Sequence, residues 1–140
     1  MQLKNLGFTL DCEATPSIFT TDANSQGGMA GTLKCAYWPC DLGGDGEPDD
    51  DLLVDDPSEL LNKEIFFRIE VDEASDLPKD LCKDVFVTYI FKHEPESIYR
   101  VPQCEGKTQN PKFNYKKVHR VDQVTDYMLD YFNSGNVSVY

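Results

Sequence analysis

Residues 64–91 read EIFFRIEVDEASDLPKDLCKDVFVTYIF, and two alternating runs within this stretch decide the fold. The first run has apolar residues at every second position: Ile65, Phe67, Ile69 and Val71. A period of two is typical of a half-buried β-strand, because successive side chains point to opposite faces of the sheet. The second run is rich in β-branched and aromatic residues, and its inner face consists of Val85, Val87, Tyr89 and Phe91. We therefore predict two strands that share one core.

Shorter strands are expected on both sides of this stretch. Upstream, residues 17–39 (SIFTTDANSQGGMAGTLKCAYWP) place two candidate strands around the glycine-bearing turn 24–28, which is the pattern of a hairpin. Further segments with strand character are 6–10 (LGFTL), 97–101 (SIYRV), 113–121 (FNYKKVHRV) and 136–140 (NVSVY). We expect the last of these to have an exposed edge unless LGFTL pairs with it.

One helix is predicted, within residues 122–133 (DQVTDYMLDYFN). Its apolar positions recur at helical spacing: Val124, Tyr127, Met128 and Tyr131. Asp122 is positioned to cap the start of this helix, and Gly135 to end it. Because many short antiparallel strands accompany one short helix, we predict an all-β fold, an antiparallel β-sandwich with the helix in a connection. Its predicted core contains Ile65, Phe67, Ile69, Val71, Val85, Val87, Tyr89, Phe91, Met128 and Val137.

The composition predicts a single folded domain spanning residues 1–140. With 40% hydrophobic and 27% charged residues, the chain is apolar enough to bury one core. A net charge of -12 argues against a general role on nucleic acid, where Lys and Arg must neutralise phosphates. No apolar run approaches a membrane span and the start lacks a signal-peptide layout, so we expect a cytoplasmic protein. The cysteines form no C-x-x-C pair, and we expect free, mostly packed thiols.

Residues 41–60 differ from the rest of the chain, because they are rich in Asp, Glu, Gly and Pro and contain no Lys or Arg. This composition predicts an acidic inserted loop that is exposed to solvent. A calcium loop of the EF-hand type fits it only in part. Counted from Asp41, Asp45 and Gly46 occupy suitable positions, but Gly43 and Leu52 stand where ligands are needed.

The triplet Gly106-Lys107-Thr108 resembles the end of a nucleotide-binding loop. The upstream glycine that lets such a loop curl around phosphates is replaced here by Val101. Asn110-Pro111 stands where a helix should begin, and it predicts a turn that leads into a strand at Phe113. Because no nucleophile elbow or other catalytic motif is present either, we predict no enzymatic activity and no cofactor.

Basic residues cluster in one part of this acidic chain. The cluster consists of Lys107, Lys112, Lys116, Lys117, His119 and Arg120. In a strand, Lys117 and His119 would share one face, with Lys116 and Arg120 on the other. Two interpretations remain open: a strand edge kept soluble by lysine, or a patch for an acidic partner or anionic lipid, made of Lys107, Lys112, Lys116, Lys117 and Arg120.

Residues 64–91, together with GKTQNPKFNYKKV at 106–118, resemble a C2 domain. The shared features are the alternating strand, a turn of the form A-x-x-L-P, the aromatic strand, and a K-T-x-N-P-x-[FW]-N segment. Calcium-binding members clamp the ion between aspartates on two loops. Only Asp80 and Asp84 resemble the aspartates of the first loop, and Cys82-Lys83 replaces the small residues usual before the second. A calcium-dependent phospholipid-binding C2 domain is therefore an alternative function.

A narrower resemblance is to the C2-like tail region of kinesin motors of the third family. It rests on LNKEIFFRIEV (61–71), DLPKDLCKDVFVTYIF (76–91) and QVTDYMLDYFNSGNVSVY (123–140). The glycine-rich hairpin GGMAGTLKC (27–35) adds to it, so that the likeness spans residues 17–140. C2 modules of ciliary transition-zone scaffolds share N-P-x-[FY]-N-[FY], found here at 110–115, and they are a second alternative.

The kinesin resemblance implies a non-catalytic tail module of a microtubule-based motor. ATP hydrolysis and microtubule binding would belong to other domains of the parent protein. The module itself would contact a protein partner, a cargo adaptor or an anionic membrane, or regulate the motor. It implies a cytoplasmic location associated with the cytoskeleton.

Overall fold

The computed structural model describes residues 1–21, 28–91 and 98–140 of the chain, which form an all-β fold with antiparallel sheets, as predicted. The strands are β1 (Cys12–Ala14), β2 (Ser17–Phe19), β3 (Met29–Cys40), β4 (Ile65–Ser75), β5 (Lys83–Val85), β6 (Thr88–Ile90), β7 (Ile98–Arg100), β8 (Cys104–Lys107), β9 (Lys112–Val121) and β10 (Ser138–Val139). The helices are α1 (Asp126–Ser134) and the 3-10 helices η1 (Lys4–Phe8), η2 (Asp50–Leu52) and η3 (Pro57–Leu60).

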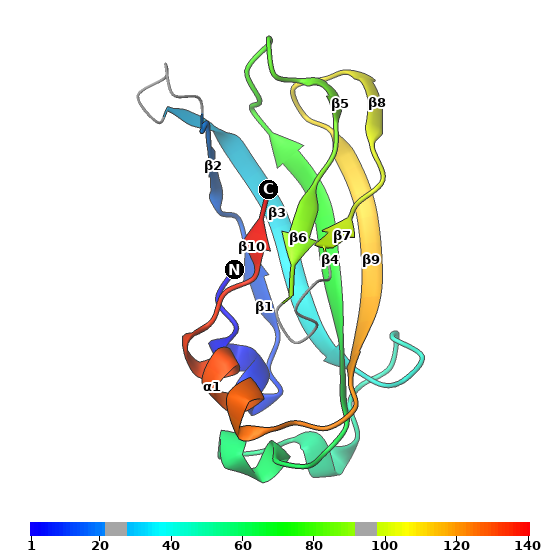
Figure 1. Cartoon of the computed structure of the whole chain (residues 1–140). Coiled ribbons are helices and arrows are strands. Elements are labelled where there is room, and N and C mark those ends of the chain that lie inside the picture. Colours follow the sequence, from blue (N-terminus) through cyan, green and yellow to red (C-terminus); the bar gives the residue numbers. More distant parts are fainter. Residues whose placement is uncertain (22–27, 92–97) are drawn as a thin grey trace.

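The strands form two layers that face each other (Figure 1). The larger sheet has the order β1-β3-β4-β9, with β2 also paired to β3. The opposite layer holds β10-β6-β7 and the separate pair β5-β8. All of these pairs are antiparallel. Because β2 and β10 each lie at an edge, the two layers end close to one another on that side.

The predicted strand at 65–71 is confirmed as the start of β4, which lies between β3 and β9. Burial alternates along it as the sequence pattern requires, with Ile65, Phe67, Ile69 and Val71 all buried. The Phe67 ring meets Phe91 of the opposite layer edge-on, with centroids 4.8 Å apart. This contact lies at the centre of the core.

His119 extends this aromatic contact, and it does not belong to the basic surface. Its imidazole is 3% exposed, stacks on Phe67 at 5.4 Å and lies edge-on to Tyr99 at 4.5 Å. Nε2 of His119 is 2.8 Å from the Tyr89 hydroxyl, forming a buried hydrogen bond between the layers. Burial raises the pKa of that hydroxyl, so Tyr89 stays neutral.

The second predicted strand is interrupted in the structure. It divides into β5 and β6, and Phe86 and Val87 between them belong to neither strand. β5 pairs with β8 whereas β6 pairs with β7 and β10, so the break is where the chain changes partners. Val87, Tyr89 and Phe91 are buried as predicted, and Val85 is half-buried.

The prediction that residues 6–10 form a strand is wrong. They belong largely to η1, whose turn is closed by the bond from Thr9 N–H to the Leu6 carbonyl and ends with Thr9 at φ 56°. The aliphatic side chains at the start of the chain nevertheless enter the core, since Leu3 and Leu6 are buried. In a 3-10 turn, side chains three residues apart point in the same direction, so Leu3 and Leu6 can both face the core. In a strand, residues three apart point to opposite faces of the sheet.

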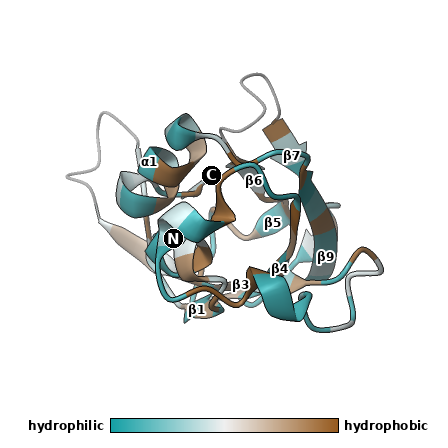
Figure 2. Ribbon diagram, turned by 90° about the horizontal axis from the view of Figure 1, so that it is seen from below, coloured by the Kyte–Doolittle hydropathy of each residue, from teal (hydrophilic) through white to brown (hydrophobic). Residues whose placement is uncertain are grey.

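The helix exists as predicted, but its start and its inner face differ. Thr125, not Asp122, is the N-cap and accepts the Met128 N–H, because Val124 is held outside the helix by backbone bonds to residues 62–63. Tyr127, which was predicted to lie on the apolar face of the helix, is 65% exposed. Gly135 is the C-cap as expected, and Met128 is buried. Figures 1 and 2 place α1 beside the N-terminal segment, where η1 packs against it.

The acidic segment 41–60 connects β3 to β4 and is better anchored than a purely solvated loop. Its two 3-10 helices, η2 and η3, bury Leu52 and Leu60. The Asp41 carboxylate accepts the Gly44 N–H at 2.8 Å, and Asp56 and Glu59 form a capping box at the start of η3. Several of these carboxylates therefore stabilise local turns.

The upstream hairpin prediction is confirmed for its strands, since β2 pairs with β3 antiparallel. Most of the predicted turn lies outside the described residues. All five cysteines are free, and Cys35, Cys40 and Cys82 are buried, as expected for packed thiols. Burial raises the pKa of the Cys40 thiol to about 11, which leaves it protonated at neutral pH.

Replacing Phe67 by Ala tests the central contact. Because Phe67 is 0% exposed, we expect Phe67→Ala to lower the free energy of unfolding in urea by about 3–5 kcal/mol. The control is Phe66→Ala, which removes the same atoms from the outer, half-buried face of the strand. Equal losses for the two variants would show that the layers do not depend on Phe67.

Candidate binding groove

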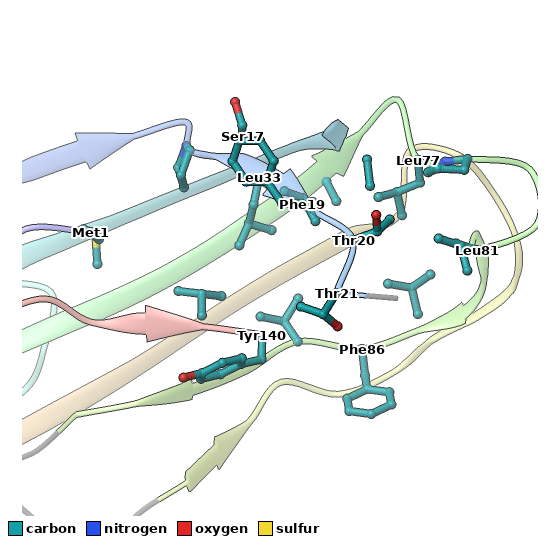
Figure 3. Close-up of a pocket in the computed structure, with 18 of the residues that line it drawn as sticks. Met1, Ser17, Phe19, Thr20, Thr21, Leu33, Leu77, Leu81, Phe86 and Tyr140 are labelled. Carbon is teal, nitrogen blue, oxygen red and sulfur yellow. The ribbon is translucent and has the colours of Figure 1, made fainter. Parts of the chain in front are cut away.

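A groove with a volume of about 730 Å³ opens between β2 and β10, where the two layers end (Figure 3). Its floor contains the buried residues Ala30, Leu33, Ala74 and Leu77. We call this feature the edge groove, bounded by β2 and β10 and floored by these four residues.

The rim of the edge groove is apolar and exposed. Phe19 from β2 is 62% exposed, Leu81 is 49% exposed, and Phe86 and Tyr140 are exposed as well. None of the lining residues carries a charged side chain. The Arg100 guanidinium lies 4.0 Å from the Phe86 ring centroid, so one cation borders the rim.

Small residues create the space beneath the rim. Ala74 stands opposite Leu33 in the β3–β4 register. Only Leu33 of this pair has a large side chain, so the space above Ala74 stays open. At Gly31, φ is +116° and an added Cβ would lie 2.2 Å from the Ser75 carbonyl oxygen, so only glycine lets β3 approach the end of β4 here. Ala30 and Gly31 thus build a part of β3 that lies close to β4 and has little side-chain volume.

The edge of residues 136–140 was predicted to be exposed unless LGFTL covered it, and LGFTL does not. Met1 covers one residue of this edge, because its backbone forms two hydrogen bonds with the backbone of Val137, at 2.8 and 3.0 Å. Gln2 and Asn136 form a β-bridge next to it. Val139 and Tyr140, farther along, line the groove instead.

Sequence reasoning did not find the groove, because its lining comes from segments that are far apart in the chain. The only local signal was a set of large apolar residues in short predicted strands, such as Phe19 and Phe86. A period-two pattern does not show which of these apolar residues lie at a sheet edge, where no neighbouring strand covers them.

Asp80 and Asp84, the predicted calcium candidates, lie in the connection after Leu77 and on β5. The Asp84 carboxylate accepts the Gly106 N–H at 2.9 Å, which ties β5 to β8. Within residues 1–21, 28–91 and 98–140, no group of three or more His, Cys, Asp or Glu side chains is arranged to hold a metal ion. The structure thus gives Asp84 a backbone partner in the β5–β8 pair.

The basic cluster is spread out and partly neutralised. Lys116 pairs with Glu70 at 3.2 Å, and Arg120 pairs with Glu64 at 2.5 Å and with Asp122 at 2.8 Å. The ion pairs of Lys116 and Arg120 lie on the outer face of β9, as the alternation predicted. Lys117 lies on the other face, with its Nζ 5.4 Å from the Tyr99 ring centroid.

Two lysines of the cluster are less constrained. Lys107 is on β8 and Lys112 begins β9; both are exposed, and neither has an ion pair with another described residue. The predicted patch therefore consists of separated cations on two strands rather than one focused surface.

The triplet Gly106-Lys107-Thr108, which resembles the end of a nucleotide-binding loop, lies at the end of a strand and leads into a turn. Gly106 and Lys107 belong to β8, and the next element in the chain is the strand β9 instead of a helix. Asn110 turns the chain as predicted, because its side-chain oxygen accepts the Asp76 N–H at 3.0 Å. The Leu77 N–H donates to the Gln109 carbonyl at 3.0 Å, so the L-P turn and the N-P turn are in direct contact.

No protein-family model matches this chain, and no curated protein matches it. Of the helices in the described parts of the chain, none is long and apolar enough to cross a membrane.

The groove should bind an environment-sensitive apolar dye such as anilinonaphthalene sulfonate. Truncating its rim with Phe19→Ser and Leu81→Ser should remove most of the dye fluorescence, because the exposed apolar surface is lost. The matched control, Leu53→Ser with Tyr127→Ser, truncates exposed apolar residues elsewhere and should leave the fluorescence unchanged. Equal effects of the two pairs would contradict a single apolar site.

Proposed function

We propose that this chain is a non-catalytic binding module with a C2-like β-sandwich fold, which contacts a partner protein through the edge groove. The groove carries the proposal. It is apolar, it lacks charged lining side chains, and it lies open beside a rim that includes Phe19 and Leu81. A contiguous apolar surface of this kind is typical of an interaction site, because covering it with a partner removes apolar area from water and lowers the free energy.

The C2-like assignment is supported by the order and contacts of the motifs that suggested it. The glycine-rich hairpin precedes β4, and the L-P turn at Leu77-Pro78 precedes β5. The N-P turn at Asn110-Pro111 begins β9 and is hydrogen-bonded to the L-P turn through Asp76 and Leu77. The two motifs that carry the resemblance thus meet at one end of the strands.

The kinesin resemblance supplies the proposed context, which is the tail of a microtubule-based motor in the cytoplasm. There the module would bind a cargo adaptor or another part of the motor and would leave ATP hydrolysis to a separate domain. The paired state of Lys116 and Arg120 favours a protein contact at the groove over an anionic membrane contact at β9.

Photo-crosslinking in cells tests the protein-contact proposal. A benzophenone amino acid at position 19 should crosslink to polypeptide, whereas the same group at position 127 should do so rarely. Phe19 and Tyr127 are matched, because both are aromatic and their exposed fractions are 62% and 65%. Crosslinks to lipid alone at position 19, or equal polypeptide yields at both positions, would overturn the proposal.

Calcium titration separates the proposal from the phospholipid-binding alternative. We expect calcium to leave the melting temperature unchanged, because Asp84 accepts a backbone N–H at 2.9 Å and no set of three acidic ligands surrounds it in the described residues. The double variant Asp80→Asn with Asp84→Asn should behave identically. Micromolar calcium binding that this variant abolishes would favour the alternative function.

A further inference from the structure

On the outer edge of β10, Val139 has backbone N–H and C=O groups that are unpaired among the residues that the structure describes. Tyr140 and Thr88 exchange both of their backbone bonds, at 2.7 and 2.8 Å. Because bonded and non-bonded pairs alternate along an antiparallel ladder, the next pair, Val139 with Tyr89, directs its N–H and C=O groups away from the partner strand. On that outer side Met1 already bonds Val137. Among the described residues, none bonds the Val139 N–H or C=O.

We propose that an extended segment of a partner protein binds by adding a strand to this edge, with its backbone paired to Val139. This inference rests on the proposed function and gives the form of its partner. The guest strand would lie in the edge groove between β10 and β2, and its residue opposite Val139 would exchange both N–H···O=C bonds with it. Strand addition at a free sheet edge is a recurring mode of peptide recognition.

The groove floor specifies the side chains of the guest. Alternate residues of a strand point to one face, so every second guest side chain would face Leu33 and Leu77. The small Ala30 and Ala74 leave room there for branched or aromatic side chains. The guest should therefore carry apolar residues at positions i, i+2 and i+4. A lipid chain would fill the same volume but would leave the Val139 backbone groups unpaired.

Charge decides between a foreign segment and a second copy of this chain. The chain carries a net charge of -12, so two copies would repel each other as they approach. The lining itself has no charged side chain that would attract a particular sign. A segment whose apolar core is flanked by Lys or Arg would be attracted by the acidic protein as a whole. We therefore assign the guest as an apolar strand with basic flanks.

A random peptide library displayed on phage and selected on the whole chain tests the guest chemistry. Selected peptides should show apolar residues at alternate positions and an excess of Lys and Arg at their ends. Selection for helical i, i+3, i+4 spacing, or for acidic flanks, would overturn the inference. The variant Phe19→Ser with Leu81→Ser serves for counter-selection, because it differs from the chain only at two residues of the apolar rim. Peptides that bind this variant equally well are discarded.

Backbone chemistry tests the pairing. N-methylation of the selected peptide at the residue opposite Val139 should weaken binding about ten-fold or more, whereas N-methylation at the adjacent residue should affect it less. Val139→Pro removes the other donor of the pair, the Val139 N–H, and should weaken binding to a similar degree, whereas Val139→Ala keeps that N–H. The peptide should also slow hydrogen exchange at the Val139 amide of the unchanged protein, a measurement that needs no variant.

The outcomes separate this inference from the proposed function. If peptides bind and lose affinity with the rim variant, but tolerate both N-methyl groups and leave Val139 exchange unchanged, the strand pairing is wrong while protein binding at the groove stands. If no peptide is selected and position 19 crosslinks only to lipid, both are wrong. A dimer in ultracentrifugation that protects Val139 without any peptide would replace the partner strand with a second copy.

Discussion

The edge-on contact between Phe67 and Phe91, with ring centroids 4.8 Å apart, holds the two layers together at their centre. Both rings are fully buried, and His119 packs against each of them while bonding the Tyr89 hydroxyl. Aromatic rings of this size fix both the spacing and the relative rotation of the layers, because a dense interior does not tolerate gaps. The positions of the surrounding strands therefore depend on this cluster.

Away from that cluster, at the edge where β2 and β10 lie, small side chains of β3 and β4 line the space between the layers. Ala30 and Ala74 occupy positions where a larger residue would close the space between β2 and β10. Gly31 permits the close approach of β3 to the end of β4, which positions those alanines. The groove is thus a consequence of how volume is distributed along two neighbouring strands. The floor of the groove is apolar because Leu33, Ala74 and Leu77 also belong to the hydrophobic core.

Two edge strands, β9 and β10, are protected unequally. β9, the edge of the larger sheet, carries lysines and the paired Arg120, and such charges discourage the addition of a foreign strand. β10 lies at the edge of the opposite layer, and neither Ser138 nor Val139 is charged. Met1 pairs with Val137, the residue just before β10. This asymmetry favours strand addition at β10 over strand addition at β9.

The sequence by itself determined the features whose cause is local. The strict alternation from Ile65 to Val71 predicted β4 and its buried face, and Asn110-Pro111 predicted the turn before β9. Gly135 marked the end of the helix correctly. In each case the residues themselves restrict the backbone or separate polar from apolar faces, so distant contacts were not needed.

Tertiary structure alone decided the features that depend on a partner elsewhere in the chain. Val124 lies outside the helix because its backbone bonds residues 62–63, which moved the cap from Asp122 to Thr125. The break at Phe86 follows from a change of pairing strand, and the edge groove follows from which strands end without a neighbour. Hydrogen bonds and burial between segments far apart in sequence leave no periodic trace in either segment. Only the assembled sheets therefore show that, within the described part of the chain, the backbone of Val139 in β10 is unpaired on its outer side, beside an apolar floor.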